Sequence, residues 1–449
     1  MEGKKFDVFV IGSGVAGQTV ALKCAKAGMR VAIADNREFG GTCANRGCDP
    51  KKVLLAATEA FDMAQRLKGK GIEGNLKISW KKLQKFKGSF TDSIPARTEE
   101  KLREAGIKLY HQSPSFEGKQ SLLVEGKKVK AEKIVVATGY EPRKLIVKGS
   151  KFLQTSDDFL NLKKLPKKIV FVGAGYIGME FAHMACRAGS DVTIIDSGKR
   201  SLKSFDPDLV SELTSFSKKM GIEFVFGSKI ESIKKGRKKF KLIYKKGGHS
   251  KELKADAVFN TAGRVPAISA LDLAKGNVSF NENGIETNSY LQSKSNEFVY
   301  ACGDVSDNGL PLTPLSGREG YIVAENILKN NQKKVDIPVI PSVVFTLPHL
   351  ASVGYSEEEA KSRYKNVVVK TNDATKWFNA KRINASIYAY KIILNERTEE
   401  IVGAHLLGPQ AAETINIMTM AINQKMKADE LQATLFTYPS WTNDLKSMV

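Results

Sequence analysis

Cysteine is scarce in this chain of 449 residues, which holds five: Cys24, Cys43, Cys48, Cys186 and Cys302. An odd, sparse set in a long chain excludes the disulfide framework of small secreted proteins. Three of them, Cys24, Cys186 and Cys302, lie among apolar residues, and we expect each to be an inert thiol of the core. Only four residues separate Cys43 from Cys48, so this pair needs a chemical explanation.

Long apolar runs are also missing. No run approaches the roughly 18 residues that span a membrane, so we expect no membrane partner. The first residues, MEGKKFDVFVIG, lack the charged-then-apolar leader of a secreted protein. These absences predict a globular cytoplasmic protein, and at roughly 100–200 residues per domain the length predicts two to four domains.

Acidic residues are in the minority, because 70 Lys and Arg stand against 48 Asp and Glu, a formal net charge of +22. Such an excess favours either a polyanionic partner or a lysine-rich surface that also attracts a polyanionic cofactor. We assign the lysines to scattered turns and helix faces without interleaved aromatic residues, as at Lys234, Lys235, Lys238, Lys239, Lys245 and Lys246. The sequence therefore predicts a solvated surface and no nucleic-acid partner.

A glycine pattern follows the first apolar run. Residues Phe6–Ile11 predict a buried parallel strand. Three glycines come next with GxGxxG spacing: Gly12, Gly14 and Gly17. A helix over 16–27 and a strand over 30–34, ending in Asp35, complete the unit. This order predicts a dinucleotide site, because the turn lets the backbone approach a pyrophosphate and Asp35 is placed to bond a ribose.

The same pattern recurs 161 residues later. A strand over 168–172 precedes a second glycine set, a helix and a strand ending in Asp196. The second set is Gly173, Gly175 and Gly178. Two dinucleotide sites suggest a flavin and a nicotinamide that exchange hydride. The acid at 196 favours the ribose of NADH over a 2′-phosphate, although Lys199 and Arg200 follow closely and could accept a phosphate, so we expect NADH.

The rest of the chain alternates helices and strands. Residues 51–105 are predicted to be largely helical, and strands leading into glycine turns are expected at 133–142, 257–266 and 297–305. Beyond Pro338 and Pro341, strands are predicted at 343–346, 367–369, 385–395 and 401–407, and helices at 411–425 and 428–435. This last pattern predicts an α+β domain.

The cysteine pair lies in GGTCANRGCDPKKVL, residues 40–54. The spacing is too long for a CxxC redox motif, and no second Cys or His pair lies near enough in sequence to complete a zinc site. A distorted helical turn could bring the two sulfurs together, and a helix N-terminus would lower the pKa values of both thiols. The pair is therefore a candidate redox centre.

The motifs occur in a single order along the chain. They are GxGxxG (12–17), GGTCxNxGCxPxK (40–52), ATG (137–139), GxGYIGxE (173–180), GR-P (263–266), Gly-Asp (303–304), LTP (312–314) and FTLPHLASVGYSEEEA (345–360). In these motifs the chain resembles, over essentially its whole length, the pyridine nucleotide–disulfide oxidoreductases, which include glutathione reductase, dihydrolipoamide dehydrogenase and mercuric reductase.

The resemblance implies an α/β fold. Two Rossmann-like dinucleotide-binding domains, one for FAD and one for NAD(P), would be followed by a C-terminal α+β dimerisation domain. The implied segments are 1–145 and 262–336 for FAD, 146–261 for NAD(P) and 337–449 for dimerisation. The resemblance further implies a homodimer, with each site completed by the partner's C-terminal segment.

The resemblance also implies catalytic roles. Cys48 would be the charge-transfer thiol beside the flavin, and Cys43 the interchange thiol that attacks the acceptor. Lys52 and Glu180 would form an ion pair beside the flavin ring, and Tyr176 would be the gate on its nicotinamide side. In the implied reaction NAD(P)H reduces FAD, FAD reduces the Cys43–Cys48 disulfide, and the thiols reduce a small acceptor.

Cofactor contacts are implied in the same way. Asp304 would hold the ribityl chain of FAD, and Asp35 its adenosine ribose. The full set expected to contact FAD or NAD(P)H is Gly12, Gly14, Gly17, Asp35, Gly41, Thr42, Lys52, Ala137, Thr138, Gly139, Gly173, Gly175, Gly178, Asp196, Gly263, Arg264, Gly303, Asp304, Leu312 and Thr313.

One family feature is absent. Disulfide reductases of this family end in a His-Pro-x-x-x-Glu pattern, and here Tyr438 and Asn443 stand at its two ends. The histidines lie elsewhere, at His111, His183, His249, His349 and His405. Loss of a general base typically costs about 10²–10⁴-fold in rate, and a phenol with a pKa of about 10 is a poor base.

The sequence therefore does not identify the electron acceptor. We expect a disulfide or other small acceptor, and a mercuric reductase-like metal reductase or a quinone reductase is the alternative. Mercuric reductases carry a C-terminal cysteine pair, and no cysteine follows Tyr438 here. A third hypothesis, a basic scaffold protein without turnover, is disfavoured by the intact set of Cys43, Cys48, Lys52 and Glu180.

Overall fold

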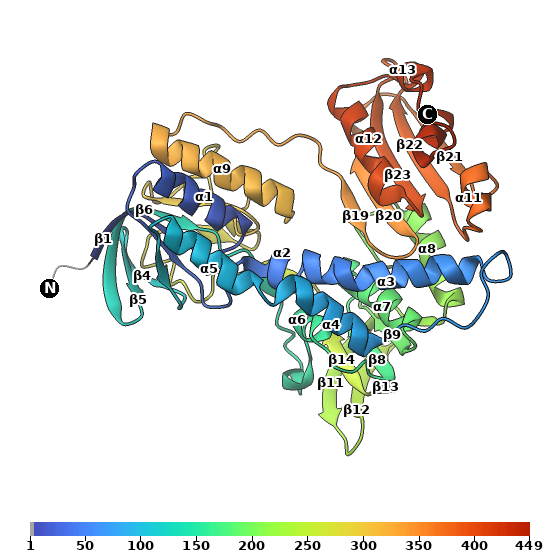
Figure 1. Ribbon diagram of the computed structural model, residues 1–449, viewed down its shortest axis with the longest axis horizontal. Helices are drawn as coiled ribbons and strands as arrows, with labels where there is room; N and C mark the ends of the chain where they lie inside the picture. Colours follow the sequence, from blue (N-terminus) through green and yellow to red (C-terminus); the bar gives the residue numbers. More distant parts are fainter. Residues whose placement is uncertain (1–3) are drawn as a thin grey trace. The chain divides into compact units, whose positions relative to one another are not determined.

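The computed structural model describes residues 4–449, which fold into two units. The first unit comprises the chain up to Val53, Lys85–Arg143 and Arg264–Ile337. The second comprises Leu54–Gln84, Lys144–Gly263 and Pro338–Val449. The mixed α/β class predicted from the sequence is confirmed (Figure 1), whereas the four predicted segment boundaries stay a prediction. Within 4–449, no helix has the length and apolar character needed to cross a bilayer.

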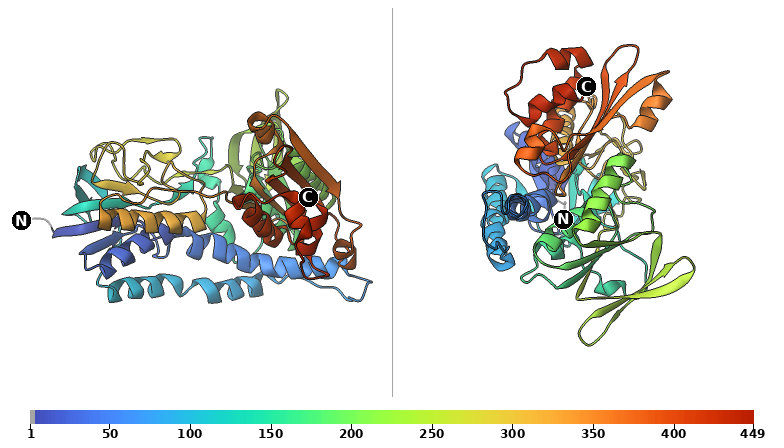
Figure 2. Two further views of the ribbon diagram at one scale, coloured as in Figure 1. Left: turned by 90° about the horizontal axis from the view of Figure 1, so that it is seen from above. Right: turned by 90° about the vertical axis from the view of Figure 1, so that its right-hand side faces the viewer.

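A largely parallel sheet forms the centre of the first unit. Its strands follow the order β3 (Lys108–Tyr110), β2 (Val31–Ala34), β1 (Lys4–Ile11), β6 (Lys127–Val136), β5 (Ser121–Val124) and β4 (Ser115–Gly118), with β18 (Val299–Ala301) also paired to β6. Every residue of β2 is buried, as expected for a parallel strand covered on both faces. Two helices, α1 (Val15–Lys26) and α9 (Thr313–Lys329), lie side by side and pack on this sheet (Figures 1 and 2).

Smaller elements complete the first unit. They are α2 (Gly41–Arg46), α5 (Ile94–Glu104), the pair β7 (Tyr140–Pro142) and β15 (Arg264–Pro266), and the pair β16 (Phe280–Asn281) and β17 (Gly284–Ile285). Two helices, α3 (Cys48–Arg66) and α4 (Trp80–Thr91), each have residues in both units. The predicted helical character of 51–105 is thereby confirmed, with breaks between α3, α4 and α5.

The second unit repeats the nucleotide-binding pattern. Its parallel sheet has the order β10 (Ile222–Val225), β9 (Asp191–Ile195), β8 (Lys168–Val172) and β14 (Ala257–Asn260), and its helices are α6 (Ser156–Leu160), α7 (Tyr176–Arg187) and α8 (Pro207–Lys219). A separate antiparallel sheet is formed by β11 (Ser228–Lys235), β12 (Phe240–Lys246) and β13 (His249–Ala255). The assignment of lysines to turns and helix faces was wrong for Lys234, Lys235, Lys245 and Lys246, which lie in strands. Lys238 and Lys239 do lie in the bend between β11 and β12.

The C-terminal part of the second unit is an antiparallel sheet with helices. Its order is β19 (Ser342–Val344), β20 (His349–Gly354), β23 (Ile401–Gly408), β22 (Ala389–Asn395) and β21 (Val367–Asp373), with α10 (Glu357–Arg363), α11 (Phe378–Arg382), α12 (Ala411–Asn423), α13 (Ala428–Ala433) and α14 (Trp441–Asp444). The predicted α+β character is confirmed, but β20 was missed. Its sequence, HLASVG, carries Ala, Ser and Gly, and its pairing with β19 and β23 stabilises the strand despite its weak local propensity.

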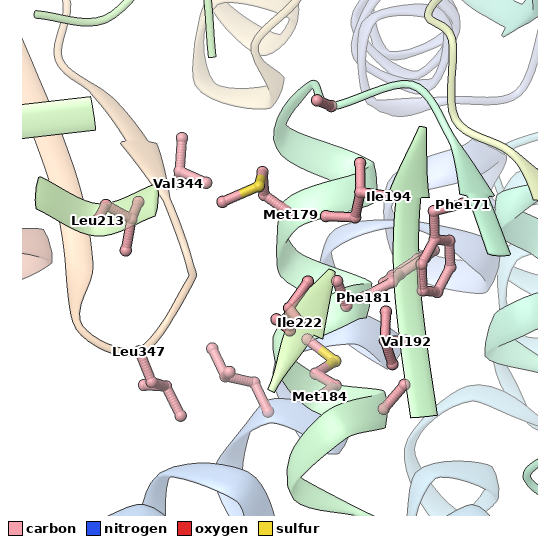
Figure 3. Close-up of a cluster of buried hydrophobic side chains, with 14 of the residues drawn as sticks. Phe171, Met179, Phe181, Met184, Val192, Ile194, Leu213, Ile222, Val344 and Leu347 are labelled. Carbon is pink, nitrogen blue, oxygen red and sulfur yellow. The ribbon is translucent and has the colours of Figure 1, made fainter. Parts of the chain in front are cut away.

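The second repeat is anchored by its helix. Phe181 and Met184 of α7 are buried against Val192, and Val344 and Leu347 belong to the same apolar cluster (Figure 3). Phe181 also stacks on Phe159, with ring centroids 4.2 Å apart. This packing holds α7, and with it the first residue of the helix, in a defined position.

The glycines that open the two nucleotide motifs are required by the backbone. Gly12 and Gly173 have φ of +107° and +115°, a region that other residues rarely adopt. A Cβ atom on Gly12 would lie 2.3 Å from the Ala137 carbonyl oxygen, and one on Gly173 would lie 2.4 Å from that of Thr261. In each motif, therefore, the chain turns into the helix at the C-terminal edge of its sheet.

Candidate active site

The two cysteines lie at the junction of two helices. Cys43 is half-buried in α2, and Cys48 is the exposed first residue of α3. Gly47 separates the helices, and a Cβ atom on it would lie 2.9 Å from the Thr42 carbonyl oxygen. Both cysteines are free thiols, and Cys48 Sγ lies 3.6 Å from Thr313 Oγ1 at the start of α9. The fold thus joins the cysteine pair to a residue 265 positions away.

The two thiols differ in acidity. The hydrogen bond from the Cys43 thiol, together with Thr313 and Lys51, lowers the pKa of Cys48 to about 6. The same hydrogen bond and burial raise the pKa of Cys43. At neutral pH the pair therefore holds a thiolate at Cys48 and a thiol at Cys43, and the thiolate is the reactive form of cysteine.

Backbone donors at two helix ends fit a dinucleotide. Gly14 and Gly175 are the N-caps of α1 and α7, and neither helix start is capped by a side chain. The space where a Cβ of Gly175 would lie is open to 4 Å, and the nearest atom to that of Gly14 is 4.0 Å away. Uncapped helix N-termini with open space beside them are suited to pyrophosphate.

The FAD candidates cluster in the first unit. Gly41 (φ +74°) packs so closely on the first motif that its Cβ would lie 2.4 Å from Gly14 Cα. Thr42 is exposed on α2. Ala137, Thr138 and Gly139 follow β6, and within the described part of the chain Thr138 Oγ1 is buried without a hydrogen-bond partner. A buried hydroxyl in that state fits a position where a cofactor supplies the partner.

Ser13 joins the nucleotide loop to the cysteine segment. Asp35 Oδ2 accepts hydrogen bonds from the Ser13 amide (2.8 Å) and hydroxyl (2.6 Å), and Ser13 Oγ accepts one from the Gly40 amide (3.1 Å). Asp35 lies just beyond the end of β2, as predicted. The sequence analysis missed Ser13, which is fully buried. The position of Ser13 within the GxGxxG motif was the sequence signal that could have identified it.

Asp196 repeats this arrangement in the second unit. Its carboxylate accepts hydrogen bonds from the amides of Ala174 (2.7 Å) and Gly198 (2.6 Å). The Arg200 guanidinium donates to backbone carbonyls, including those of Lys203 (2.7 Å) and Leu202 (3.1 Å). The hydrogen bonds of the Arg200 guanidinium are therefore made within its own loop. The Lys199 side chain is exposed.

A second carboxyl supports the Gly303–Asp304 turn. Asp304 Oδ1 accepts a hydrogen bond from Ser316 Oγ (3.2 Å), and Glu319 Oε2 accepts one from the Gly303 amide (2.7 Å). Burial raises the pKa of Asp304 and raises that of Glu319 to about 7. Nearby, Leu312 is the N-cap of α9. Glu319, which the sequence analysis missed, thus fixes the turn that presents Asp304.

The remaining first-unit candidate is Arg264. Its guanidinium donates to the Tyr140 carbonyl oxygen (2.5 Å), which ties β15 to β7. Gly263, with φ of +106°, directly precedes it. Lys52 lies one turn after Cys48 on α3 and is exposed. These positions are compatible with the implied roles, which stay predictions.

One face of α7 holds the segment before β20. Buried Glu180 accepts a hydrogen bond from the Phe345 amide (2.8 Å), and His183 Nδ1 accepts one from the Leu347 amide (3.2 Å). Arg187 donates to the Leu347 carbonyl oxygen (2.7 Å). Tyr176 begins the same helix, half exposed. Lys52 and Glu180 belong to different units, so their ion pair stays a prediction.

Tyr438 lies in the C-terminal segment, and its side chain is 74% exposed. Asn443 lies in α14. Burial lowers the pKa values of His183 and His405, which hydrogen-bond to Ser217 and Ser352. His111, which belongs to the same unit as the two cysteines, lies 3.2 Å from Glu99.

Comparison with known proteins decides the family. Residues 6–320 match the family described as pyridine nucleotide-disulphide oxidoreductase, and residues 340–449 match its dimerisation domain. The chain belongs to this family. It is an NAD(P)H-dependent flavoprotein disulfide oxidoreductase, with FAD and a pyridine nucleotide as cofactors.

The relatives of this oxidoreductase act on several acceptors. It is 31% identical over 459 residues to glutathione reductase of Burkholderia cepacia (100% of this chain, 99% of the relative). It is 28% identical over 447 residues to mercuric reductase of Staphylococcus aureus (98% and 81%). A solved Cu(II) complex of the HOCl-induced flavoprotein disulfide reductase RclA from Escherichia coli is 27% identical, with a TM-score of 0.88 and 99% of both chains covered.

The dimerisation domain of the oxidoreductase supports the expected homodimer. Within this domain three large apolar side chains are left exposed: Phe378 (56%), Met420 (65%) and Leu435 (92%). Exposed apolar side chains of this size are common at subunit interfaces.

Proposed function

We propose that the Cys43–Cys48 pair delivers its electrons to a soft metal ion such as Cu(II) or Hg(II) in preference to a disulfide substrate. The observation that carries this proposal is Tyr438, an exposed phenol at the position of the family's catalytic histidine. A disulfide acceptor needs a group that protonates its leaving thiolate, whereas a metal ion is reduced without receiving a proton.

The unequal acidity of the thiols supports this acceptor. The Cys48 thiolate is available to bind a metal ion at neutral pH, and binding favours loss of the Cys43 proton to water, because thiol ligands bind metals in deprotonated form. The two thiolates then form the Cys43–Cys48 disulfide. The two electrons released reduce one Hg(II) to Hg(0), or two Cu(II) ions to Cu(I). Bound FAD supplies the electrons of the pyridine nucleotide that restore the dithiol.

A panel of acceptors tests the proposal. We expect NADH oxidation with Cu(II) or Hg(II), and turnover with glutathione disulfide or lipoamide about 10²–10⁴-fold slower, as for loss of a general base. Cys43→Ser should remove the metal-dependent activity, while Cys24→Ser, which changes a buried thiol, should keep it. Disulfide turnover as fast as metal turnover would refute the proposal. If the Cys43→Ser variant still reduced quinones, this result would instead favour direct electron transfer from the flavin to the acceptor.

We propose further that the enzyme prefers NADH. The negative charge of Asp196 repels a 2′-phosphate, and the Arg200 guanidinium, which could offset it, is bound to backbone carbonyls. We expect kcat/KM for NADH to exceed that for NADPH by at least about tenfold, which corresponds to roughly 1.4 kcal/mol. Asp196→Asn should reduce the ratio severalfold, and Asp191→Asn at the other end of β9 should leave it unchanged. A native preference for NADPH would contradict this assignment.

We also propose that the enzyme acts in the cytoplasm. All five cysteines are free thiols, and the cytosol keeps thiols reduced. Fractionation of the native host cells, with the enzyme followed by immunoblotting, would test this; recovery outside the cytosolic fraction would contradict it.

A further inference from the structure

More than a third of the net positive charge of the chain lies in one small sheet and the turns that connect its strands. Residues 228–256, which contain β11, β12 and β13, hold eleven Lys and Arg and three Asp and Glu. This excess of eight charges, in 29 residues, is more than a third of the net charge of +22. All eleven basic residues are exposed. The structure therefore gathers lysines that the sequence analysis treated as scattered.

One face of this sheet is covered and the other is open. Ile230, Leu242, Tyr244 and Ala255 are buried in a cluster with strands of the neighbouring parallel sheet. Since side chains alternate along a strand, the intervening residues face away from that cluster. They are exposed or half-buried, and they include five lysines: Lys229, Lys234, Lys241, Lys245 and Lys254.

The strand register places the open-face lysines in two rows. Lys229 of β11 is opposite Lys245 of β12. Lys241 of β12 is opposite both Lys234 of β11 and Lys254 of β13. Like charges directly opposite one another destabilise a sheet. The arrangement is thus unfavourable for the isolated protein, and a bound polyanion would relieve it.

Acidic side chains offset only part of this charge. The Glu231 carboxylate accepts a hydrogen bond from Ser250 Oγ (2.8 Å), and Ser250 is opposite Lys245 in the first row. Glu252 lies 3.6 Å from Lys241 Nζ and 3.8 Å from Lys254 Nζ. For Lys229, Lys234 and Lys245, no carboxylate of the described residues lies within ion-pair distance of Nζ. These three side chains are the ones most available to a ligand.

A row of different chemistry separates the two cationic rows. Ile243 and Glu252 are opposite one another between them. Lys241 and Lys245 are four residues apart on β12, which corresponds to about 13 Å along the strand. This is close to the roughly 12 Å width of the major groove of B-DNA. The two rows of lysines therefore match the two phosphate backbones of a duplex. The row of Ile243 and Glu252 between them matches the groove.

We propose that the open face of β11–β13 binds double-helical nucleic acid through its phosphates, without reading the sequence. A uniformly anionic membrane would place Glu252 against its headgroups, and the face offers no exposed apolar side chain for insertion. Single-stranded nucleic acid calls for exposed aromatic side chains, but Phe240 is half-buried and Tyr244 buried. An acidic protein is disfavoured because lysine is depleted in protein interfaces.

The test uses the full-length, FAD-loaded enzyme and a fluorescent 20-base-pair DNA duplex of arbitrary sequence. Fluorescence anisotropy between 50 and 200 mM KCl should show binding that weakens steeply with salt. The triple variant Lys229→Gln/Lys234→Gln/Lys245→Gln should bind at least about tenfold more weakly at 50 mM KCl. It should also lower the slope of log K against log[KCl] by about three, one for each phosphate contact. Neither the thermal midpoint nor NADH oxidation should fall.

A matched triple separates this surface from general positive charge. Lys163→Gln/Lys164→Gln/Lys167→Gln removes the same charge from exposed residues that precede β8, and we expect less than about threefold weakening. Equal weakening by both triples, or no binding by the native enzyme, would overturn the proposal. It would also be overturned if vesicles of phosphatidylserine and phosphatidylcholine bound more tightly than the duplex and lost binding with the first triple, since the surface would then be a membrane site.

Discussion

Replacing Cys48 by serine is expected to abolish the long-wavelength absorption that a thiolate beside a flavin gives after two-electron reduction. Metal reduction should fall by at least about 1,000-fold, because the pair can no longer form a disulfide. Serine keeps the size of the side chain and cannot supply a thiolate. The measurement is anaerobic titration with NADH, followed by a steady-state assay with Cu(II).

The same absorption band should depend on pH. The pKa of Cys48 is lowered to about 6 by its hydrogen bond from Cys43, so the thiolate predominates above pH 6 and is lost as the pH falls through that value. The band should therefore be fully developed at pH 8 and largely absent at pH 5. Cys186→Ser is the control, because this half-buried thiol lies on α7 and donates to the Met220 carbonyl oxygen (3.4 Å). Survival of the band in Cys48→Ser would show that Cys48 is not the charge-transfer thiol.

A loss of stability of about 3–5 kcal/mol is expected for Lys391→Met. Lys391 Nζ is buried in β22 and lies 2.9 Å from Asp206, 2.5 Å from Asp208 and 3.2 Å from Glu357. Burial works against this charge, but the carboxylates outweigh it and raise the pKa of Lys391. Removing one partner of a buried ion pair typically costs this much, because the other charge stays buried.

The size of the effect depends on Asp206. Its side chain is 1% exposed, and it also caps α8 by accepting hydrogen bonds from the amides of Asp208 and Leu209 (both 3.1 Å). These two bonds remain in the variant, so we expect a value near the lower end of the range. Urea denaturation followed by circular dichroism measures it.

Lys361→Met is the matched control for Lys391→Met. Lys361 also pairs with Glu357 (2.6 Å), but its side chain is 59% exposed. Exposed pairs contribute about 1 kcal/mol or less, so the control should unfold almost as the native enzyme does. If the two variants lost the same stability, burial of Lys391 would not be the source of the effect.

Much of the candidate site could be predicted because its chemistry is local. Gly12 and Gly173 are required by backbone conformations that other residues rarely adopt, and such requirements are visible in sequence spacing. Asp35 and Asp196 lie just beyond strands that the apolar pattern already marked. That Tyr438 stands at the position of the missing histidine could likewise be read from the C-terminal motif, whereas its exposure is visible only in the structure.

Contacts between distant segments could not be predicted in this way. Strand β20 exists because β19 and β23 pair with it, although its own residues have weak strand propensity. Glu319 was missed because only the fold brings its carboxylate to the Gly303 amide, 16 residues earlier in the sequence. The lysines of β11 and β12 could be assigned to a common face only once the register of the strands was known.

By itself, the sequence determined the two nucleotide motifs, the redox-active cysteine pair and the absence of the usual histidine. The reason is that glycine conformation and cysteine chemistry depend on residue type and short spacing. Only the tertiary structure decided that Thr313 lies beside Cys48 and which lysines share one face of β11–β13. The first depends on packing between residues 265 positions apart, and the second depends on the register between paired strands. Residue type and short spacing reveal neither.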